Sequence, residues 1–87
     1  MHIVYVISNP RGKIYIGQTE NLEQRLNNHN LGRFPGYTAR LGGPWRLVYT
    51  EECLNRSGAL RRERYFKQGA GYRALKGLIE KQYRGVA

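Results

Sequence analysis

The sequence contains no aspartate, and it is poor in the other residues that usually build metal and redox sites. All six acidic residues are glutamate, one residue is cysteine and two are histidine. Nuclease sites that hold paired metals on several aspartates, EF-hand loops and conventional Ser-His-Asp triads are therefore excluded. Cys53, His2 and His29 are three scattered soft ligands, too few for a four-ligand zinc site.

Long hydrophobic runs are also missing. The longest aliphatic run begins at Ile3 and breaks at Ser8, which is far short of a membrane span and too short for a secretion signal. A single cysteine forms no disulfide within the chain and fits a reducing compartment. We therefore expect a cytoplasmic protein with no membrane association. The 87 residues predict one domain, 1–87, with a modest core.

Positive charge is in large excess. Lys and Arg number 15 against six acids, eleven of the cations are Arg, and the net charge is +9. Such a balance indicates a polyanionic partner, and the prevalence of Arg favours nucleic acid because guanidinium groups bind phosphate bidentately. The alternative is a basic soluble protein without such a partner.

A β-hairpin is predicted at the start of the chain. His2 to Ser8 are rich in β-branched and aromatic residues, and residues 9–12 read Asn-Pro-Arg-Gly, which fits a type I turn with Gly12 in the left-handed region. Lys13 to Gln18 form the returning strand. A three-residue loop of this kind pairs Ile7 with Tyr15 and Tyr5 with Gly17.

This register separates the two faces of the hairpin. One face is uniformly aliphatic and is expected to be the core face; it carries Val4, Val6, Ile14 and Ile16. The other face carries Tyr5 and Tyr15, and Gly17 opposite Tyr5 leaves a space there.

The rest of the chain predicts an α+β fold, a three-stranded antiparallel sheet flanked by helices in the order β-β-α-β-α-α. The expected segments are a helix from Thr19 to Asn30 with Asn21 as its N-cap, an ordered but mobile loop from Leu31 to Pro44, a strand from Trp45 to Glu52, a helix from Asn55 or Ser57 to near Gly69, and a helix from Tyr72 to Tyr83.

Five polar residues interrupt these patterns. Tyr5 and Tyr15 lie on the non-aliphatic sheet face, Arg25 and His29 share a helical stripe with leucines, and Glu63 lies on an apolar stripe. Each has an ordinary alternative: sheet aromatics, helix-edge polar residues, and an i,i+4 ion pair of Glu63 with Lys67. If their elements pack round one point, the five polar groups meet there.

The five residues fall within a familiar set of motifs. Val4-Tyr5 followed by Tyr15-Ile16-Gly17 resembles the two halves of the GIY-YIG nuclease signature. The resemblance covers nearly the whole chain, since it continues through residues 15–19, Leu22, Arg25, Leu26, His29-Asn30 and the Arg-Arg-Glu run at 61–63. The sequence is most similar to small stand-alone bacterial predicted endonucleases, which carry a Gly-rich loop ending in a Tyr-Thr pair like Tyr37-Thr38. It is more distantly similar to the nuclease domain of the excision-repair subunit UvrC and to homing endonucleases.

The resemblance implies hydrolysis of phosphodiester bonds in DNA with one divalent ion, Mg²⁺ or Mn²⁺, and a structure-specific role in repair or recombination. It makes Glu63 the single protein ligand of the metal and Arg25 the residue that stabilises charge on the phosphoryl group. It makes either Tyr5 or Tyr15 the residue that orients or deprotonates the attacking water. His29 is expected to hydrogen-bond a tyrosine hydroxyl or relay its proton.

Further basic and aromatic residues are candidate nucleic-acid contacts. They are Lys13, Arg33, Tyr37, Arg40, Arg46 and Lys67, together with Arg61 and Arg64. Phosphate contacts position a nucleic acid without specifying its sequence, so strong sequence specificity is not expected. Two alternatives remain open: a non-catalytic nucleic-acid-binding module, and a nuclease subunit that needs a protein partner. The oligomeric state is open as well.

Overall fold

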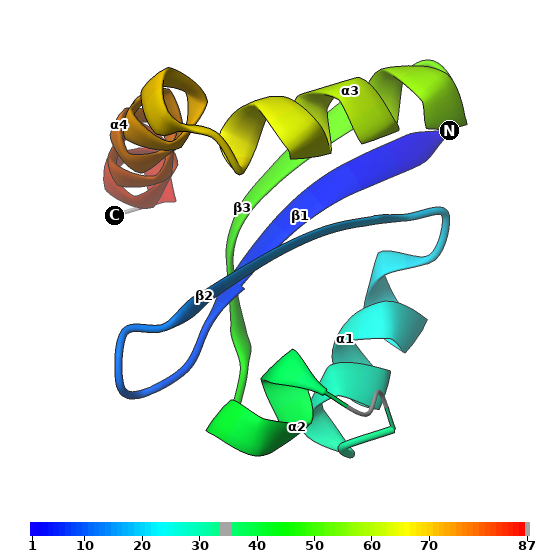
Figure 1. Cartoon of the computed structure of the whole chain (residues 1–87), viewed down its shortest axis with the longest axis vertical. Helices are drawn as coiled ribbons and strands as arrows, with labels where there is room; N and C mark the ends of the chain where they lie inside the picture. The colour runs from blue at the N-terminus through cyan, green and yellow to red at the C-terminus, as the bar shows by residue number, and fades with distance from the viewer. Residues whose placement is uncertain (34–35, 87) are drawn as a thin grey trace.

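The protein folds as a small sheet with helices on both faces (Figure 1). The computed structural model describes residues 1–33 and 36–86, apart from the side chains of Tyr37 and of residues 83–86. The strands are β1 (His2–Ser8), β2 (Ile14–Thr19) and β3 (Arg46–Cys53), and they form one antiparallel sheet in the order β2-β1-β3. The central strand is thus β1, and β2 is an edge strand.

Four helices complete the described part of the chain. They are α1 (Leu22–Asn30), α2 (Tyr37–Leu41), α3 (Arg56–Phe66) and α4 (Gly69–Val86). Figure 1 shows α3 and α4 over one face of the sheet and α1 and α2 beyond the other. The predicted α+β class and the three-stranded antiparallel sheet are confirmed.

The hairpin between β1 and β2 has the predicted geometry. The Asn9 amide donates to the Lys13 carbonyl at 3.1 Å, and the Gly12 amide donates to the Asn9 carbonyl at 2.9 Å. Gly12 has a φ of +79°, the left-handed conformation that glycine adopts without strain. The register pairs Tyr5 with Gly17 and Ile7 with Tyr15, as expected.

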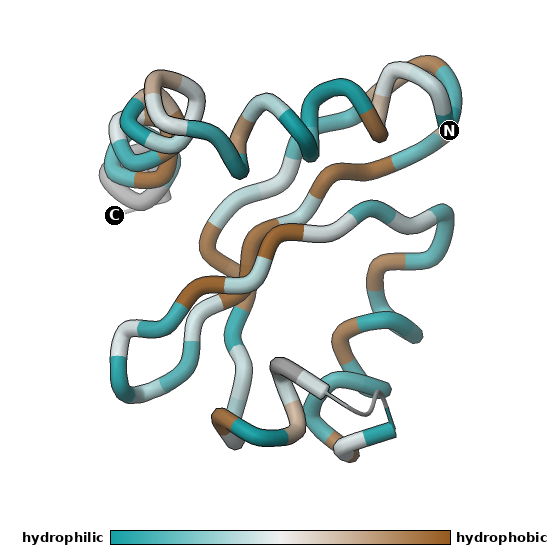
Figure 2. The backbone as a smooth tube through the Cα atoms, in the orientation of Figure 1, coloured by the Kyte–Doolittle hydropathy of each residue, from teal (hydrophilic) through white to brown (hydrophobic). Residues whose placement is uncertain are grey.

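Both faces of the sheet are packed, whereas the sequence predicted a core on the aliphatic face alone. That face holds one cluster, formed by Val4, Val6, Ile16 and Tyr49 with Ala59, Phe66 and Leu75 of the helices. The tyrosine face holds a second cluster of Tyr5, Ile7 and Trp45, against which Tyr15, Leu22, Leu26 and Leu41 pack. Figure 2 shows hydrophobic stretches where the strands cross the centre of the molecule and hydrophilic ones at the hairpin turn.

The predicted loop from Leu31 to Pro44 contains the short helix α2. Two glycines with positive φ flank it, Gly36 at +108° and Gly42 at +76°. Five residues between two turns form one helical turn because Thr38 is buried against α1 and Leu41 packs in the second cluster. Tertiary packing of this kind overrides a weak local propensity.

Two helices begin elsewhere than predicted. Residues 19–21 do not belong to α1: Thr19 still pairs with Ile3 in the sheet, and Asn21 caps the helix by accepting the Gln24 amide at 3.1 Å. Helix α4 begins at Gly69 rather than at Tyr72. No helix in the described part of the chain is long and apolar enough to cross a membrane.

Candidate active site at the edge of the sheet

The Tyr5 side chain lies across the edge strand at Gly17. Tyr5 is 1% exposed, and a Cβ placed on Gly17 would lie 2.6 Å from the Tyr5 hydroxyl oxygen. The space that the register leaves at Gly17 is therefore filled by the tyrosine itself. The ring of Tyr15 lies beside it, with 6.2 Å between centroids.

His29 joins this tyrosine pair to helix α2. Its Nε2 lies 2.8 Å from the Tyr5 hydroxyl, and its Nδ1 lies 3.1 Å from the Thr38 hydroxyl. The imidazole also packs on Tyr15, with ring centroids 4.9 Å apart. The expected bond between His29 and a tyrosine hydroxyl is present. The sequence did not predict a role for Thr38, because the residue that it contacts, His29, lies nine residues away on another helix.

Burial keeps both partners of this bond neutral. It raises the pKa of the Tyr5 hydroxyl well above its ordinary value; Tyr15 and Glu63 raise it further, and the Arg25 charge opposes them. Burial, followed by the charge of Arg25, lowers the pKa of His29. A neutral imidazole has one donor and one acceptor nitrogen. The Tyr5 hydroxyl and the His29 imidazole can therefore pass a proton between them.

Glu63 reaches the site from the opposite side of the sheet. It belongs to α3, its side chain is 19% exposed, and its Oε2 accepts from Lys67 Nζ at 2.9 Å. The ordinary i,i+4 ion pair is therefore present. The Glu63 and Arg25 charges both act on the Tyr5 hydroxyl, so these two residues, on helices at opposite faces, are within electrostatic reach of the same group.

Arg62 fixes the orientation of the helix that carries Glu63. Its guanidinium donates to the Glu51 carboxylate of β3 through Nε and, at 2.9 Å, through Nη2, and it lies 4.6 Å from the Phe66 ring centroid. The Arg62 bond, as the largest cause, lowers the pKa of Glu51. Successive helical residues differ by about 100° in direction. With Arg62 held on β3, its neighbour Glu63 is turned toward another part of the sheet.

The donor set limits what metal this site could hold. Among the described residues, no group of three or more His, Cys, Asp or Glu lies together. Glu63 is the acidic group whose charge reaches the tyrosine pair, so the protein could contribute one carboxylate. Mg²⁺ fits such a site because it retains several waters and binds through one or two carboxylates. The Lys67 ammonium contacts this carboxylate at 2.9 Å, so a metal ion would have to displace it.

The candidate nucleic-acid contacts are dispersed. Lys13 and Lys67 line a hollow of about 600 Å³ beside β2, which we call the hairpin hollow; residues 12–16, Lys67 and Tyr72 surround it. Arg25 lines a second hollow of about 500 Å³ next to the start of α1, together with Arg56. The other candidates lie away from these two hollows or outside the described side chains. Arg33 is beyond α1, Arg40 is exposed on α2, Arg46 begins the far edge strand, Arg61 and Arg64 are exposed on α3, and the side chain of Tyr37 lies outside the described residues.

The hairpin with its two tyrosines and the helices around it match the pattern of the GIY-YIG nuclease family. The chain belongs to this family, because the model of the GIY-YIG catalytic domain matches residues 1–73.

Its relatives include bacterial proteins of similar length. The chain is 38% identical over 81 residues to a UPF0213 protein of Oceanobacillus iheyensis, with 93% of this chain and 92% of the relative covered. It is 38% identical over 86 residues to a UPF0213 protein of Bacillus licheniformis, with 98% and 87% covered. The solution NMR structure of a UPF0213 protein from Bacillus halodurans is similar with a TM-score of 0.54 and 32% identity; 88% of this chain and 83% of that chain are covered.

Proposed function

We propose that this protein is a metal-dependent endonuclease that hydrolyses phosphodiester bonds in DNA. The observation that carries the proposal is the environment of the Tyr5 hydroxyl. It hydrogen-bonds His29 at 2.8 Å, its ring lies beside that of Tyr15, and it lies within the field of Arg25 and Glu63. A structural tyrosine needs one hydrogen-bond partner, not a base, an arginine and a carboxylate together.

The two tyrosines take different parts in this mechanism. Tyr15 is only half-buried, so its hydroxyl can hold the attacking water. Tyr5 is buried and its pKa is raised, so it remains protonated and does not itself act as a phenolate base at neutral pH. Its part is to hold the Tyr15 hydroxyl in position and to exchange a proton with His29.

The charged residues act on the phosphate. Arg25 offers a fixed positive charge to the phosphoryl oxygens, whose negative charge grows in the transition state. Glu63 would hold the divalent ion, Mg²⁺ or Mn²⁺, which when bound supplies charge stabilisation at the phosphate and the leaving oxygen. Lys67 would then be released from the carboxylate to contact the nucleic-acid backbone.

Positive charge supports the choice of substrate. The net charge of +9 and the cations beside β2 suit a polyanion. The proposed contacts bind phosphates, so the enzyme selects DNA by shape rather than by sequence. Branched or damaged DNA, as met in repair or recombination in the cytoplasm, is the substrate form we propose.

A cleavage assay with a matched pair of variants tests the proposal. Purified protein is incubated with supercoiled plasmid and with a branched duplex, in Mg²⁺, in Mn²⁺ and with a chelator. We expect cutting that requires the ion and that falls by about a hundredfold or more in Glu63→Gln, since loss of one electrostatic group from an active site costs about that much. Glu52→Gln, which alters an exposed glutamate on β3, is expected to cut normally.

The other outcomes identify the alternatives. Cutting that survives Glu63→Gln contradicts the site assignment and indicates a contaminant. Salt-sensitive DNA binding without any cutting, alone or after addition of a cell extract, indicates a non-catalytic binding module. Cutting that appears only with the extract and still depends on Glu63 indicates a subunit that needs a protein partner.

A further inference from the structure

The hairpin hollow lies next to the candidate active site, and two of its residues belong to both. Tyr15 lines the hollow and packs on Tyr5 and His29. Lys67 lines the hollow and contacts the Glu63 carboxylate at 2.9 Å. A ligand in the hairpin hollow would therefore lie beside Tyr15 and Glu63 of the candidate active site.

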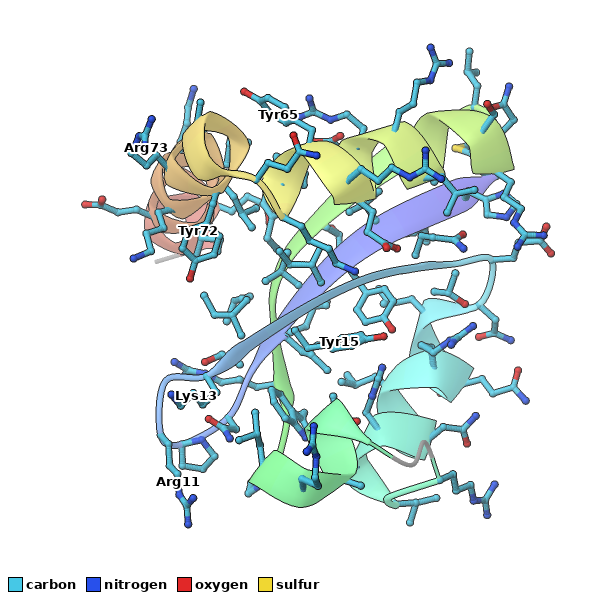
Figure 3. All side chains as sticks on the ribbon, viewed as in Figure 1. Arg11, Lys13, Tyr15, Tyr65, Tyr72 and Arg73 are labelled. Carbon is cyan, nitrogen blue, oxygen red and sulfur yellow. The ribbon has the colours of Figure 1, made fainter. Side chains whose placement is uncertain are left out.

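The lining combines two kinds of group. Lys13 from the hairpin and Lys67 from the end of α3 supply positive charge, and none of the described residues that line the hollow is acidic. Tyr72 supplies an aromatic ring, and Ile14 and Ile16 of β2 supply aliphatic side chains. Tyr15 also borders the hollow from β2, although its ring packs on the opposite face of the sheet with Tyr5 and His29. Figure 3 shows Tyr72 extending from α4 toward the hairpin, where Lys13 lies just before β2, whereas Tyr15 points from β2 toward α1.

Tyr72 has no part in the mechanism described above, and its surroundings are unusual for a core tyrosine. It is half-buried, and it is absent from both hydrophobic clusters. The ammonium of Lys76, one turn further along α4, lies 5.1 Å from the centroid of its ring. A cation against an aromatic ring at the wall of a basic hollow makes a surface suited to a group that is both planar and anionic.

We propose that the hairpin hollow binds the nucleotide next to the scissile phosphate, with its base stacked on Tyr72 and its phosphate between Lys13 and Lys67. The volume of about 600 Å³ lies within the range of pockets that hold small organic ligands. Aromatic rings bind bases of any sequence because every base has a π-face. The inference rests on the proposed nuclease function and adds to it an extruded or single-stranded nucleotide as the form that is bound.

The aromatic ring of Tyr72 is the reason to propose a nucleotide rather than a plain polyanion as the ligand. A phosphate chain needs only the lysines, whereas a base adds contact with Tyr72 and with the aliphatic side chains of β2. The hollow opens beside an edge strand, so a duplex would have to release one nucleotide to fill it. This requirement favours frayed, branched or damaged DNA, in which unpairing costs least.

Binding without metal tests the inference separately from cleavage. In a chelating buffer at fixed salt, the affinity of the protein is measured by fluorescence anisotropy for a short thymidine oligonucleotide and for a fully abasic oligonucleotide of equal length. The abasic chain keeps every phosphate and lacks every base. We expect the thymidine chain to bind about five- to a hundredfold more tightly, which is the effect of one or more stacked bases.

Variants then locate the base. Tyr72→Ala is expected to remove most of the preference for the thymidine chain, and Tyr72→Phe is expected to keep it because the ring remains. Tyr65→Ala, which alters an exposed tyrosine on α3 outside the hollow, is the matched control and should keep the preference. Lys13→Ala should weaken binding of both chains more than Arg11→Ala does, since Arg11 lies in the same turn outside the hollow.

Several results would overturn the inference. Equal affinity of the unaltered protein for the two chains would show that no base is bound. A preference that Tyr72→Ala leaves intact, or that Tyr65→Ala removes as fully, would place the base elsewhere. If Tyr72→Ala does not fold, Tyr72→Phe still decides the question. Loss of the preference for the thymidine chain in Tyr72→Phe would contradict stacking, and retention of that preference would support stacking. A preference for the thymidine chain without any cutting would support this inference and contradict the proposed nuclease activity. Glu63-dependent cutting without such a preference would support the nuclease activity and contradict this inference.

Discussion

At Gly17, the absence of a side chain decides where the Tyr5 hydroxyl lies. A β-carbon there would approach the hydroxyl oxygen to 2.6 Å and the ring carbon that bears it to 2.8 Å. The ring has no room to move away, since Tyr5 is buried and its hydroxyl is bonded to His29. Gly17 of the second motif must therefore lack a side chain so that Tyr5 of the first motif can pack against it. This contact joins two residues that are far apart in the sequence.

Gly17→Ala tests this close approach. We expect the added methyl group to displace the Tyr5 hydroxyl from His29 and to destabilise the fold by about 1–3 kcal/mol, as overpacking does. For a domain of this size the melting temperature should fall by roughly 4–8 °C for each kcal/mol. Thermal unfolding measures the stability and the plasmid assay measures cutting. Unchanged stability and cutting would mean that the Tyr5 hydroxyl does not occupy this position.

His29 makes the stability of the protein depend on pH. Its pKa is lowered in the folded state by burial and by Arg25, so the unfolded state binds the proton more readily. The stabilisation is thus complete above the ordinary histidine pKa of about 6.5 and is lost as the pH falls toward the lowered value, with a slope of at most about 1.4 kcal/mol per pH unit. Denaturant unfolding between pH 7 and about pH 5 measures this loss of stability. The interval lies above the pH range in which titration of Glu51 contributes to stability.

Two variants identify the group that titrates. His29→Gln keeps a polar side chain without a titrating ring, and it should flatten the dependence on pH. His2→Gln, which alters the other histidine of the chain, should retain it. A slope that survives in His29→Gln would assign the proton uptake to another group.

At the scale of elements, the corner between α3 and α4 depends on one glycine. A β-carbon on Gly71 would lie 1.8 Å from the carbonyl oxygen of Tyr65, so α4 can cross the end of α3 only without a side chain at this position. Gly77, two turns further along the same helix, has nothing within 4 Å of the corresponding point. The close crossing places Tyr72 beside the hairpin and Leu75 in the first cluster.

The two glycines of α4 predict opposite outcomes for one substitution. Gly77→Ala should stabilise the protein by about 1 kcal/mol, since alanine is the better helix former and nothing obstructs it. Gly71→Ala should destabilise it by more than that, because backbone atoms of α3 would have to move. Melting temperatures of the two variants measure the difference. Equal shifts of the same sign would show that the corner is not closely packed.

At the scale of the whole molecule, the site lies where helices from both faces of the sheet reach the β2 edge. Arg25 and His29 come from the α1 face and Glu63 comes from the α3 face (Figure 1). Four cations line the two hollows beside this edge: Lys13 and Lys67 in one, Arg25 and Arg56 in the other, where Glu20 also lies. Positively charged side chains therefore lie on both sides of the pair formed by Tyr5 and Tyr15, where a nucleic-acid strand running along the β2 edge would need them.

These four cations set the expected dependence of DNA binding on salt. If each neutralises one phosphate, the affinity falls with a logarithmic slope of about −3.6 in salt concentration. Between about 50 and 200 mM salt the loss would be about a hundredfold. Titrations of labelled duplex at several salt concentrations give the slope. A flat affinity would contradict the nucleic-acid partner, and Lys13→Ala should reduce the slope by about one unit.

The sequence by itself determined the hairpin, its register and which five polar residues interrupt the hydrophobic patterns. Turn chemistry at residues 9–12 and the two-residue period of a strand are local, so they fix which residues pair and which share a face. The i,i+4 pairing of Glu63 with Lys67 is local for the same reason. The α+β class followed from the order of such elements.

Only the tertiary structure decided what surrounds those residues. Packing of both sheet faces buried Tyr5, and with burial came the raised pKa of its hydroxyl and the lowered pKa of His29. The contacts of His29 with Thr38 and the hollow shared by Lys13, Lys67 and Tyr72 join segments that are distant in the chain. Desolvation and contacts of this range depend on how helices and strands pack, and no spacing of residues within one element specifies that packing.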